Sequence, residues 1–188
     1  MQMKLSQFLE ALNEFRTDEV VVTTMASARD WPEYSDSPLD LNYAPSSMGQ
    51  GSALGLGIAL ARPERKVVVI NGDGCMLMNL GSLVTIANLR PSNLILVNIE
   101  NGVYEVTGGQ PYAGAGEVSF TGLARSAGWD SIHEFDDASQ LGPSLRSAIQ
   151  SAGPTFINVK TDSEPGPSPK AKRPIYETIN ILTKALDV

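Results

Sequence analysis

An acidic residue stands between two glycines where a long apolar segment ends. Residues 66–71 read KVVVIN, and Gly72, Asp73 and Gly74 follow directly. A carboxylate next to a buried strand is costly unless something positive lies against it. The glycines let the backbone turn sharply and let a ligand approach without a Cβ in the way. We therefore expect Asp73 to face a bound cation, the ordinary alternative being a helix N-cap.

The segment after Asp73 predicts that an anion binds at the same place. Gly74 and Cys75 open a segment with helical periodicity, and the free amides of a helix start favour an anion. An anion and a carboxylate share one site only if a cation bridges them, and Mg²⁺ does so through protein and phosphate oxygens. The next available oxygen is the side chain of Asn101, just after the apolar segment 93–99. Asp73 and Asn101 thus predict a magnesium site that holds a phosphate group.

Apolar segments of strand type alternate with helical patterns along the chain. We expect strands over 19–24, 66–72, 93–99, 131–135 and 155–161, and helices over 4–16, 46–61, 75–89, 120–127, 138–151 and 175–187. This alternation predicts an α/β fold, a three-layer α/β/α arrangement with a mainly parallel sheet covered by helices on both faces. Residues 25–46 are rich in Pro, Ser and Asp and are expected to form a loop, or a short helix followed by a loop. Ligands bind beyond the carboxyl ends of such strands, where Asp73 and the Gly-rich loop 100–118 both lie.

Composition narrows the classes of function. The chain has 188 residues, a formal net charge of −7 and one cysteine. The acidic balance disfavours nucleic acid as a partner. One cysteine forms no internal disulfide and fits a reducing compartment, and no segment reads as a signal peptide or a membrane span. We expect a single cytoplasmic domain, 1–188, in which the linker 162–174 leads to a C-terminal helix at 175–187.

The spacing of the acidic and amide residues resembles a known cofactor motif. Gly72-Asp73-Gly74 followed by Asn101-Gly102 is similar to the diphosphate-binding motif of thiamine diphosphate enzymes, although Glu100 stands where the family usually has an asparagine. The resemblance implies that Asp73, the Asn101 side chain and the Val103 carbonyl hold Mg²⁺ against the diphosphate. It also implies cofactor contacts at residues in and near the motif, namely Gly72, Gly74, Cys75 and Tyr104.

A second segment extends the resemblance. SSMGQGSALGLGIALA, residues 46–61, is similar to the helix-opening segment of the family. This likeness implies that Met48 props the cofactor in its bent form and that the Ser46 carbonyl accepts a hydrogen bond from the aminopyrimidine. Taken without the family, Met48 is an ordinary core methionine.

Two further segments, VVTTMASARDW and NGVYEVTGGQP, resemble the subgroup of phosphonopyruvate and sulfopyruvate decarboxylases. In the first of them Met25 replaces a glycine and Ala28 replaces a serine of the family pattern. The resemblance implies that Thr24 and Ser27 contact the diphosphate or an anionic group of the substrate.

The activity implied by this subgroup is decarboxylation of a small 2-oxo acid to an aldehyde and CO₂. A sulfo or phosphono group gives the substrate a second anion, for which Arg29 is the first candidate cation. Gln110 follows the Gly108-Gly109 pair and is a candidate for closing over the substrate. The ordinary alternatives are a structural ion pair for Arg29 and a solvated turn at Gln110.

The length of the chain suffices for only one of the two domains that thiamine diphosphate enzymes need. The resemblance therefore implies a separate pyrimidine-binding α subunit that supplies the catalytic glutamate. The active site would then lie at the interface of a homo- or hetero-oligomer.

Three other functions stay open at this point. The chain could belong to a carboligase that forms acetolactate, or it could bind the cofactor as a non-catalytic subunit. An NAD-dependent dehydrogenase is the third, because GQGSALG nearly matches the GxGxxG pattern and Asp73 lies about 20 residues further on. Leu54 occupies the place of the third glycine, which counts against this alternative.

Overall fold

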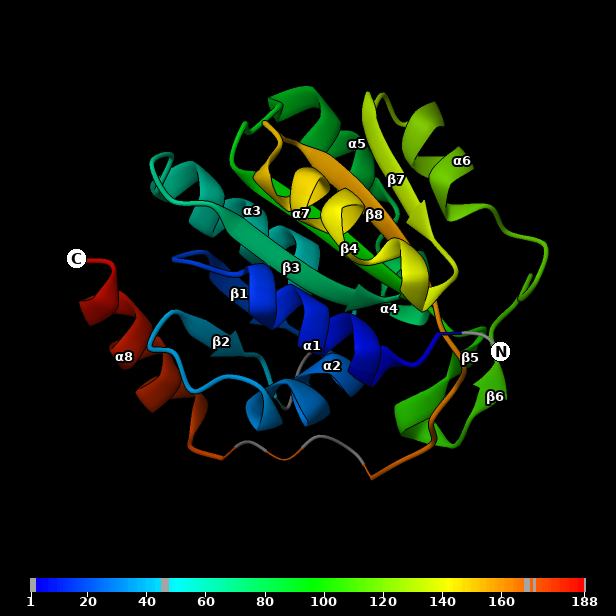
Figure 1. The fold of residues 1–188 in the computed structure, drawn as a ribbon, viewed down its shortest axis with the longest axis horizontal. Helices are drawn as coiled ribbons and strands as arrows, with labels where there is room; N and C mark the ends of the chain where they lie inside the picture. The colour runs from blue at the N-terminus through cyan, green and yellow to red at the C-terminus, as the bar shows by residue number, and fades with distance from the viewer. Residues whose placement is uncertain (1–2, 45–47, 168–169, 171, 188) are drawn as a thin grey trace.

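A parallel β-sheet forms the middle layer of the molecule (Figure 1). The computed structural model describes residues 3–44, 48–167, 170 and 172–187. Six strands pair in the order β2-β1-β3-β4-β8-β7, and every pairing is parallel. The strands are β1 (Val20–Thr23), β2 (Asp40–Asn42), β3 (Val67–Gly72), β4 (Leu94–Glu100), β7 (Ser131–Phe135) and β8 (Thr155–Lys160). The expected mainly parallel sheet is confirmed.

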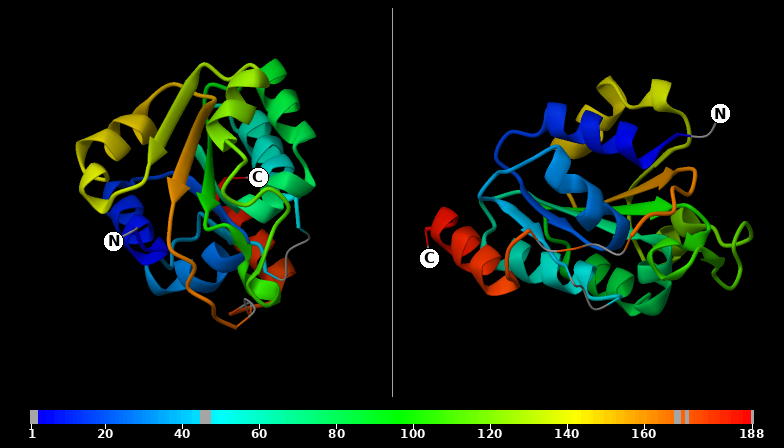
Figure 2. Two further views of the ribbon diagram at one scale, coloured as in Figure 1. Left: turned by 90° about the vertical axis from the view of Figure 1, so that its right-hand side faces the viewer. Right: turned by 90° about the horizontal axis from the view of Figure 1, so that it is seen from below.

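Helices cover both faces of the sheet, as the right-hand view of Figure 2 shows. One face carries α1 (Leu5–Phe15), α2 (Met25–Asp30) and α7 (Pro143–Gln150). The other carries α3 (Gly51–Ala61), α4 (Asp73–Met78), α5 (Gly81–Leu89), α6 (Phe120–Ser126) and α8 (Ile175–Ala185). The three-layer α/β/α prediction is therefore confirmed as well.

The burial pattern of β3 explains its continuous apolar sequence. Val68 and Ile70 pack into the core under α1 and α7, whereas Val67 and Val69 pack into the core under α3 and α5. Successive side chains of a strand point to opposite faces, so a strand buried on both sides has no polar alternation. The same reasoning holds for β4, and these two strands carry the residues that the sequence analysis singled out at their ends.

Three elements differ from the expected ones. The segment 25–46, for which a loop or a short helix followed by a loop was expected, begins with the short helix α2 but also contains the short edge strand β2, which was not expected. The helix expected over 75–89 is divided into α4 and α5, because Asn79 has non-helical backbone angles and its side chain donates a hydrogen bond to the Gly49 carbonyl, 2.9 Å away. The helix expected over 138–151 begins as a separate 3₁₀ turn, and α7 starts at Pro143, whose ring disfavours a helical residue before it.

The loop 100–118 has more structure than a simple loop. It contains the antiparallel pair β5 (Val103–Tyr104) and β6 (Gln110–Pro111), joined by a 3₁₀ turn over Glu105–Thr107. Gly108 and Gly109 have φ values of 123° and 74°, which favour glycine, so the turn between the two strands depends on this pair.

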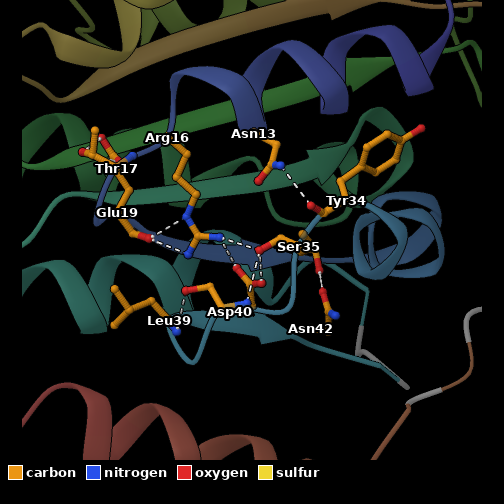
Figure 3. A network of polar contacts seen from close by, with 11 residues as sticks. Asn13, Arg16, Thr17, Glu19, Tyr34, Ser35, Leu39, Asp40 and Asn42 are labelled. Atoms are coloured by element: carbon orange, nitrogen blue, oxygen red, sulfur yellow. Dashed lines mark hydrogen bonds and ion pairs between the residues drawn. The ribbon is translucent and has the colours of Figure 1, made fainter.

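A buried ion pair fixes the edge of the sheet (Figure 3). The guanidinium of Arg16, which follows α1, lies 2.5 Å from Asp40 at the start of β2, and the two side chains are 6% and 7% exposed. Arg16 also donates to the Ser35 hydroxyl and to the carbonyl of Glu19. Every polar group of this pair thus has a partner within the protein, so the pair links the end of α1 to the start of β2.

The C-terminal helix α8 packs against β2 and buries Leu182 in the core. The segment before it, expected as a linker, contacts the rest of the chain: Lys172 donates to the Pro32 carbonyl, and the backbone N–H of Glu164 donates to Glu105. Among the residues that the structure describes, no helix is long and apolar enough to cross a membrane.

Candidate functional site

A cavity that is partly open to solvent lies at the carboxyl ends of the central strands. Its walls come from the start of α2, the β3–α4 junction and the segment 101–106, which are far apart in sequence. The lining includes most residues that the sequence analysis selected, namely Thr24, Ser27, Met48, Gly72, Asp73, Gly74, Cys75, Asn101, Val103 and Tyr104. Ser46 lies outside the described residues. The position at the strand ends agrees with the rule for parallel sheets.

Asp73 joins the ends of β3 and β4. Its side chain is buried, and one carboxylate oxygen, Oδ1, accepts a hydrogen bond of 2.7 Å from the N–H of Gly74. The other, Oδ2, accepts from the N–H groups of Asn101 and Gly102, both at 2.8 Å. Gly102 has a φ of 80°, a left-handed conformation that favours glycine and turns the chain directly after these two N–H groups.

The charge of Asp73 is not balanced by a neighbouring cation. The ion pairs formed by the described residues do not include Asp73. Burial raises the pKa of its carboxyl to about 6, although the three backbone hydrogen bonds oppose this rise, and the nearby Glu100 carboxylate acts in the same direction as burial. The ionised form is therefore costly at neutral pH until a positive charge arrives.

Asn101 presents an oxygen beside Asp73. Its Nδ2 donates to Glu105 at 2.7 Å, and its Oδ1 accepts from the N–H of Val103 at 3.1 Å. A carbonyl oxygen has two lone pairs, so Oδ1 keeps one for a further partner, and so does Oδ1 of Asp73. Within the described part of the chain, no group of three or more His, Cys, Asp and Glu side chains could hold a metal ion. A metal here would need amide, carbonyl and phosphate oxygens, which is the donor set that suits Mg²⁺.

The two glycines beside Asp73 have different roles. A Cβ on Gly74 would lie 2.5 Å from Cε1 of Tyr104, so the tyrosine ring packs directly on the Gly74 backbone. Gly72 has a φ of −93°, which any residue adopts, and a Cβ there would meet nothing within 4 Å. The expectation that both glycines serve a sharp turn is therefore wrong, because Gly74 lies within α4 and neither glycine has a positive φ. The missing side chain of Gly72 leaves open space at the cavity.

Cys75 is buried beside the cavity. The N–H of Gly49 lies 3.5 Å from its Sγ, and burial raises the pKa of the thiol. A neutral buried thiol is a poor nucleophile. The structure thus favours a backbone contribution from Cys75 to the site.

Thr24 and Ser27 use their hydroxyls to hold α2 against β3. The Thr24 hydroxyl donates to Oδ1 of Asn71 at 3.0 Å, and the Ser27 hydroxyl lies 2.7 Å from the Thr24 carbonyl and 3.0 Å from that of Ile70. Between them Met25 has a φ of 53°, a left-handed conformation that is unfavourable for a residue with a Cβ. This is the position at which the resembling family has glycine.

Two of the residues expected at the substrate lie outside the cavity lining. The guanidinium of Arg29 is held by both carboxylate oxygens of Asp30, at 2.5 and 2.8 Å, and by Glu105 at 3.1 Å. Gln110 is exposed on β6 and donates to the Thr107 hydroxyl at 3.1 Å. The predicted direct substrate contact is not supported for either residue, because Arg29 is already paired behind the wall and Gln110 faces solvent.

Sequence reasoning missed Glu105, a buried carboxylate that lines the cavity and contacts both Asn101 and Arg29. It also missed a row of amides below the site, in which Asn71, Asn98 and Asn158 are direct neighbours on β3, β4 and β8. The signal for the row was present, because each of these asparagines interrupts an otherwise apolar strand.

Comparison with known proteins agrees with this geometry. Residues 22–159 match the family described as thiamine pyrophosphate enzyme, C-terminal TPP binding domain. The chain is 37% identical to the sulfopyruvate decarboxylase subunit beta of Methanothermobacter thermautotrophicus, over 85% of this chain and 82% of that one. It is 35% identical to the phosphonopyruvate decarboxylase of Streptomyces viridochromogenes, over 77% of this chain and only 36% of that one.

A solved structure shares the fold. A Mycobacterium smegmatis protein assigned as a thiamin diphosphate-dependent enzyme superposes with a TM-score of 0.71 and 23% identity, covering 86% of this chain and 32% of that chain. The family match spans most of the sequence and includes both strand ends of the cavity. The chain therefore belongs to the thiamine pyrophosphate enzymes, of which it carries the C-terminal cofactor-binding domain.

Proposed function

We propose that this chain is the diphosphate-binding β subunit of a thiamine diphosphate- and Mg²⁺-dependent decarboxylase that acts on sulfopyruvate or phosphonopyruvate. The observation that carries the proposal is the buried Asp73 carboxylate, held by three backbone N–H groups and facing a cavity beside the Asn101 oxygen. The names of two relatives support the substrate class, because one is a sulfopyruvate decarboxylase subunit and the other a phosphonopyruvate decarboxylase. The family match leaves the dehydrogenase alternative without support.

In this proposal the chain holds the cofactor through its metal. Asp73, the Asn101 side chain and the Val103 carbonyl would coordinate Mg²⁺, and Met48, which also lines the cavity, would support the cofactor. The backbone at Gly74 and Cys75, at the start of α4, would bind the diphosphate. When bound, thiamine diphosphate supplies the carbanion and the electron sink that decarboxylation needs.

The proposal includes a separate α subunit that carries the catalytic glutamate. The chain spans 82% of a relative named as a β subunit but only about a third of the phosphonopyruvate decarboxylases, as expected if it corresponds to one half of the latter. We expect the partner to pack on exposed apolar side chains of the helices that cover one face of the sheet. They are Leu60 on α3, Met78 on α4, and Val84 and Leu89 on α5.

The cofactor proposal is tested by thermal unfolding of the full chain. Thiamine diphosphate with Mg²⁺ should raise the melting temperature, whereas NAD should not. Asp73→Asn should lose this response, because one carboxylate oxygen becomes an NH₂ group that faces N–H donors and cannot bind a metal; an affinity loss of about 100-fold or more is expected. Asp136→Asn, which removes the same charge from an exposed site, should respond like the wild type.

The activity is tested with the chain and an α subunit of a sulfopyruvate decarboxylase. The mixture should release CO₂ and an aldehyde from sulfopyruvate or phosphonopyruvate, and the chain alone should show little turnover. A ligated product in place of the aldehyde would favour the carboligase alternative, and full activity without a partner would contradict the two-subunit proposal.

A further inference from the structure

Glu105 links the Asn101 side chain to groups that lie behind the cavity wall. Its Oε2 accepts hydrogen bonds from Nδ2 of Asn101 at 2.7 Å and from the N–H of Glu164 at 3.2 Å. Its Oε1 lies 3.1 Å from Nη2 of Arg29. The side chains of Glu105 and Arg29 are only 6% and 14% exposed.

An ion pair as buried as this one has no obvious value for stability alone. Removing two charges from water costs about as much as their attraction returns, so buried pairs are weak evidence for a stabilising role. The contact that Glu105 makes with the Asn101 amide indicates a different role for the pair.

The amide of Asn101 has two chemically different ends, and Glu105 decides which end faces where. A carboxylate accepts hydrogen bonds and donates none, so it attracts Nδ2 and repels Oδ1. With Nδ2 fixed on Glu105, Oδ1 is directed to the other side, where it accepts from Val103. A flipped amide would set Oδ1 against the Glu105 carboxylate and offer NH₂ to the metal side.

Arg29 keeps Glu105 in place, and its guanidinium is closely surrounded by other groups of the protein. Asp30 holds the guanidinium on one side. On another side Gly166 packs so closely that a Cβ there would lie 2.5 Å from Nη1 and 2.9 Å from Cζ. The guanidinium is thus confined between Asp30, Glu105 and the segment that contains Gly166.

We propose that Glu105, anchored by Arg29, is a positioning residue that orients the Asn101 amide so that its oxygen faces the metal. This inference rests on the proposed function, and it gives Arg29 a role in the site without contact to the substrate. Residues that orient metal ligands typically change metal affinity by about 10–100-fold when they are replaced.

The experiment measures Mg²⁺ affinity by calorimetric titration of the full chain saturated with thiamine diphosphate. Glu105→Ala should weaken Mg²⁺ binding by about 10–100-fold. Glu105→Gln keeps the shape but offers either an oxygen or an NH₂ to Asn101, and we expect a smaller loss, of about 3–10-fold. If the alanine variant does not fold, the glutamine variant decides the question on its own.

A double-mutant cycle separates orientation of Asn101 from a structural role. If Glu105 acts through Asn101, replacing Glu105 in an Asn101→Ala background should leave Mg²⁺ affinity unchanged within about twofold. A loss of the same size in both backgrounds would overturn the inference. Glu19→Gln is the matched control, because Glu19 is also buried and also accepts from a backbone N–H, that of Thr17, outside the cavity; its Mg²⁺ affinity should match the wild type.

The outcomes also distinguish this inference from the proposed function. If the wild-type chain binds neither Mg²⁺ nor thiamine diphosphate, alone or mixed with the α subunit, the proposed function fails. If the wild type binds both and the Glu105 variants bind Mg²⁺ equally well, the proposed function stands and the positioning role is wrong.

Discussion

Asp40 at the start of β2 and Asp73 directly after β3 both have buried carboxylates, yet the surroundings of the two are opposite. Asp40 lies 2.5 Å from the guanidinium of Arg16 and accepts a hydrogen bond from Ser35 (Figure 3). The partners of Asp73 among the described residues are neutral, namely three backbone N–H groups. The Asp40 carboxylate is thus paired with a cation of the protein, whereas the Asp73 carboxylate lies at the wall of a cavity.

The difference shows how a structural charge and a ligand-binding charge can be told apart. A carboxylate that the protein neutralises is part of the fold, and its removal is expected to damage stability. A carboxylate that the protein orients but does not neutralise keeps its attraction for an external cation, and its ionisation is expected to reduce stability until that cation binds.

The largest effect is expected at the structural pair. Asp40→Ala leaves the Arg16 guanidinium buried without its counter-charge, which typically costs about 3–5 kcal/mol of unfolding free energy. Urea denaturation measures this loss. Because the pair lies outside the cavity lining, the affinity of the folded variant for Mg²⁺ and thiamine diphosphate should stay the same.

The double replacement Arg16→Met with Asp40→Leu is the matched control for that experiment. It removes both charges together, so it should be clearly more stable than Asp40→Ala. If Asp40→Ala abolished cofactor binding in a protein that is still folded, Asp40 would act on the site, and the assignment of Asp40 to the fold alone would be wrong.

The second effect is a pH dependence that comes from Asp73. Folding raises the pKa of this carboxyl from an ordinary value of 3.8 to about 6, mainly through burial. Between these two values the folded chain binds more protons than the unfolded chain, so the contribution of Asp73 to stability is lost as the pH rises from about 4 to about 6. The difference amounts to about 3 kcal/mol.

Denaturation of the chain without cofactor at pH 4.5 and pH 7.5, compared with the same measurement on Asp73→Asn, isolates this contribution. The wild type should lose more stability than the variant on going to the higher pH. Mg²⁺ with thiamine diphosphate should restore most of that loss at pH 7.5, because they bind the folded and ionised form. Equal pH dependence of the two proteins would mean that Asp73 is compensated within the fold, as Asp40 is.

The central strands and the pair Asp73 and Asn101 could be predicted from sequence because their signals are local. Continuous apolar segments mark β3 and β4, and in a parallel sheet the residues that follow neighbouring strands meet at one edge. The edge strand β2 was missed because three residues, of which only Leu41 is apolar, carry no periodicity.

The surroundings of the site could not be predicted because they depend on contacts between distant segments. Arg29 is held by Glu105 and capped by Gly166, and neither partner is near it in sequence. The break between α4 and α5 depends on the hydrogen bond from Asn79 to Gly49. A motif therefore indicates which residues bind a metal, whereas the residues that orient them appear only in the folded structure.

The smallest effect is expected at Met25, whose φ of 53° places a residue with a Cβ in the left-handed region at the cavity. Glycine there would relieve about 1–2 kcal/mol of backbone strain and would cost about 0.4–1 kcal/mol in added freedom of the unfolded chain. The net gain from Met25→Gly is then about 0.5 kcal/mol, a rise of roughly 1–2 °C in melting temperature.

Arg90→Gly is the matched control for Met25→Gly, because Arg90 has a φ of 47° at the end of α5 and is exposed outside the cavity lining. Both variants should gain a similar small amount if backbone strain is all that changes. Only Met25→Gly should also alter the affinity for thiamine diphosphate, since Met25 lines the cavity. A gain for Arg90→Gly with a loss of stability for Met25→Gly would show that the Met25 side chain contributes more by packing than its backbone costs in strain. The backbone of α2 would then not be an example of the difference between a region that stabilises the fold and a region that binds a ligand.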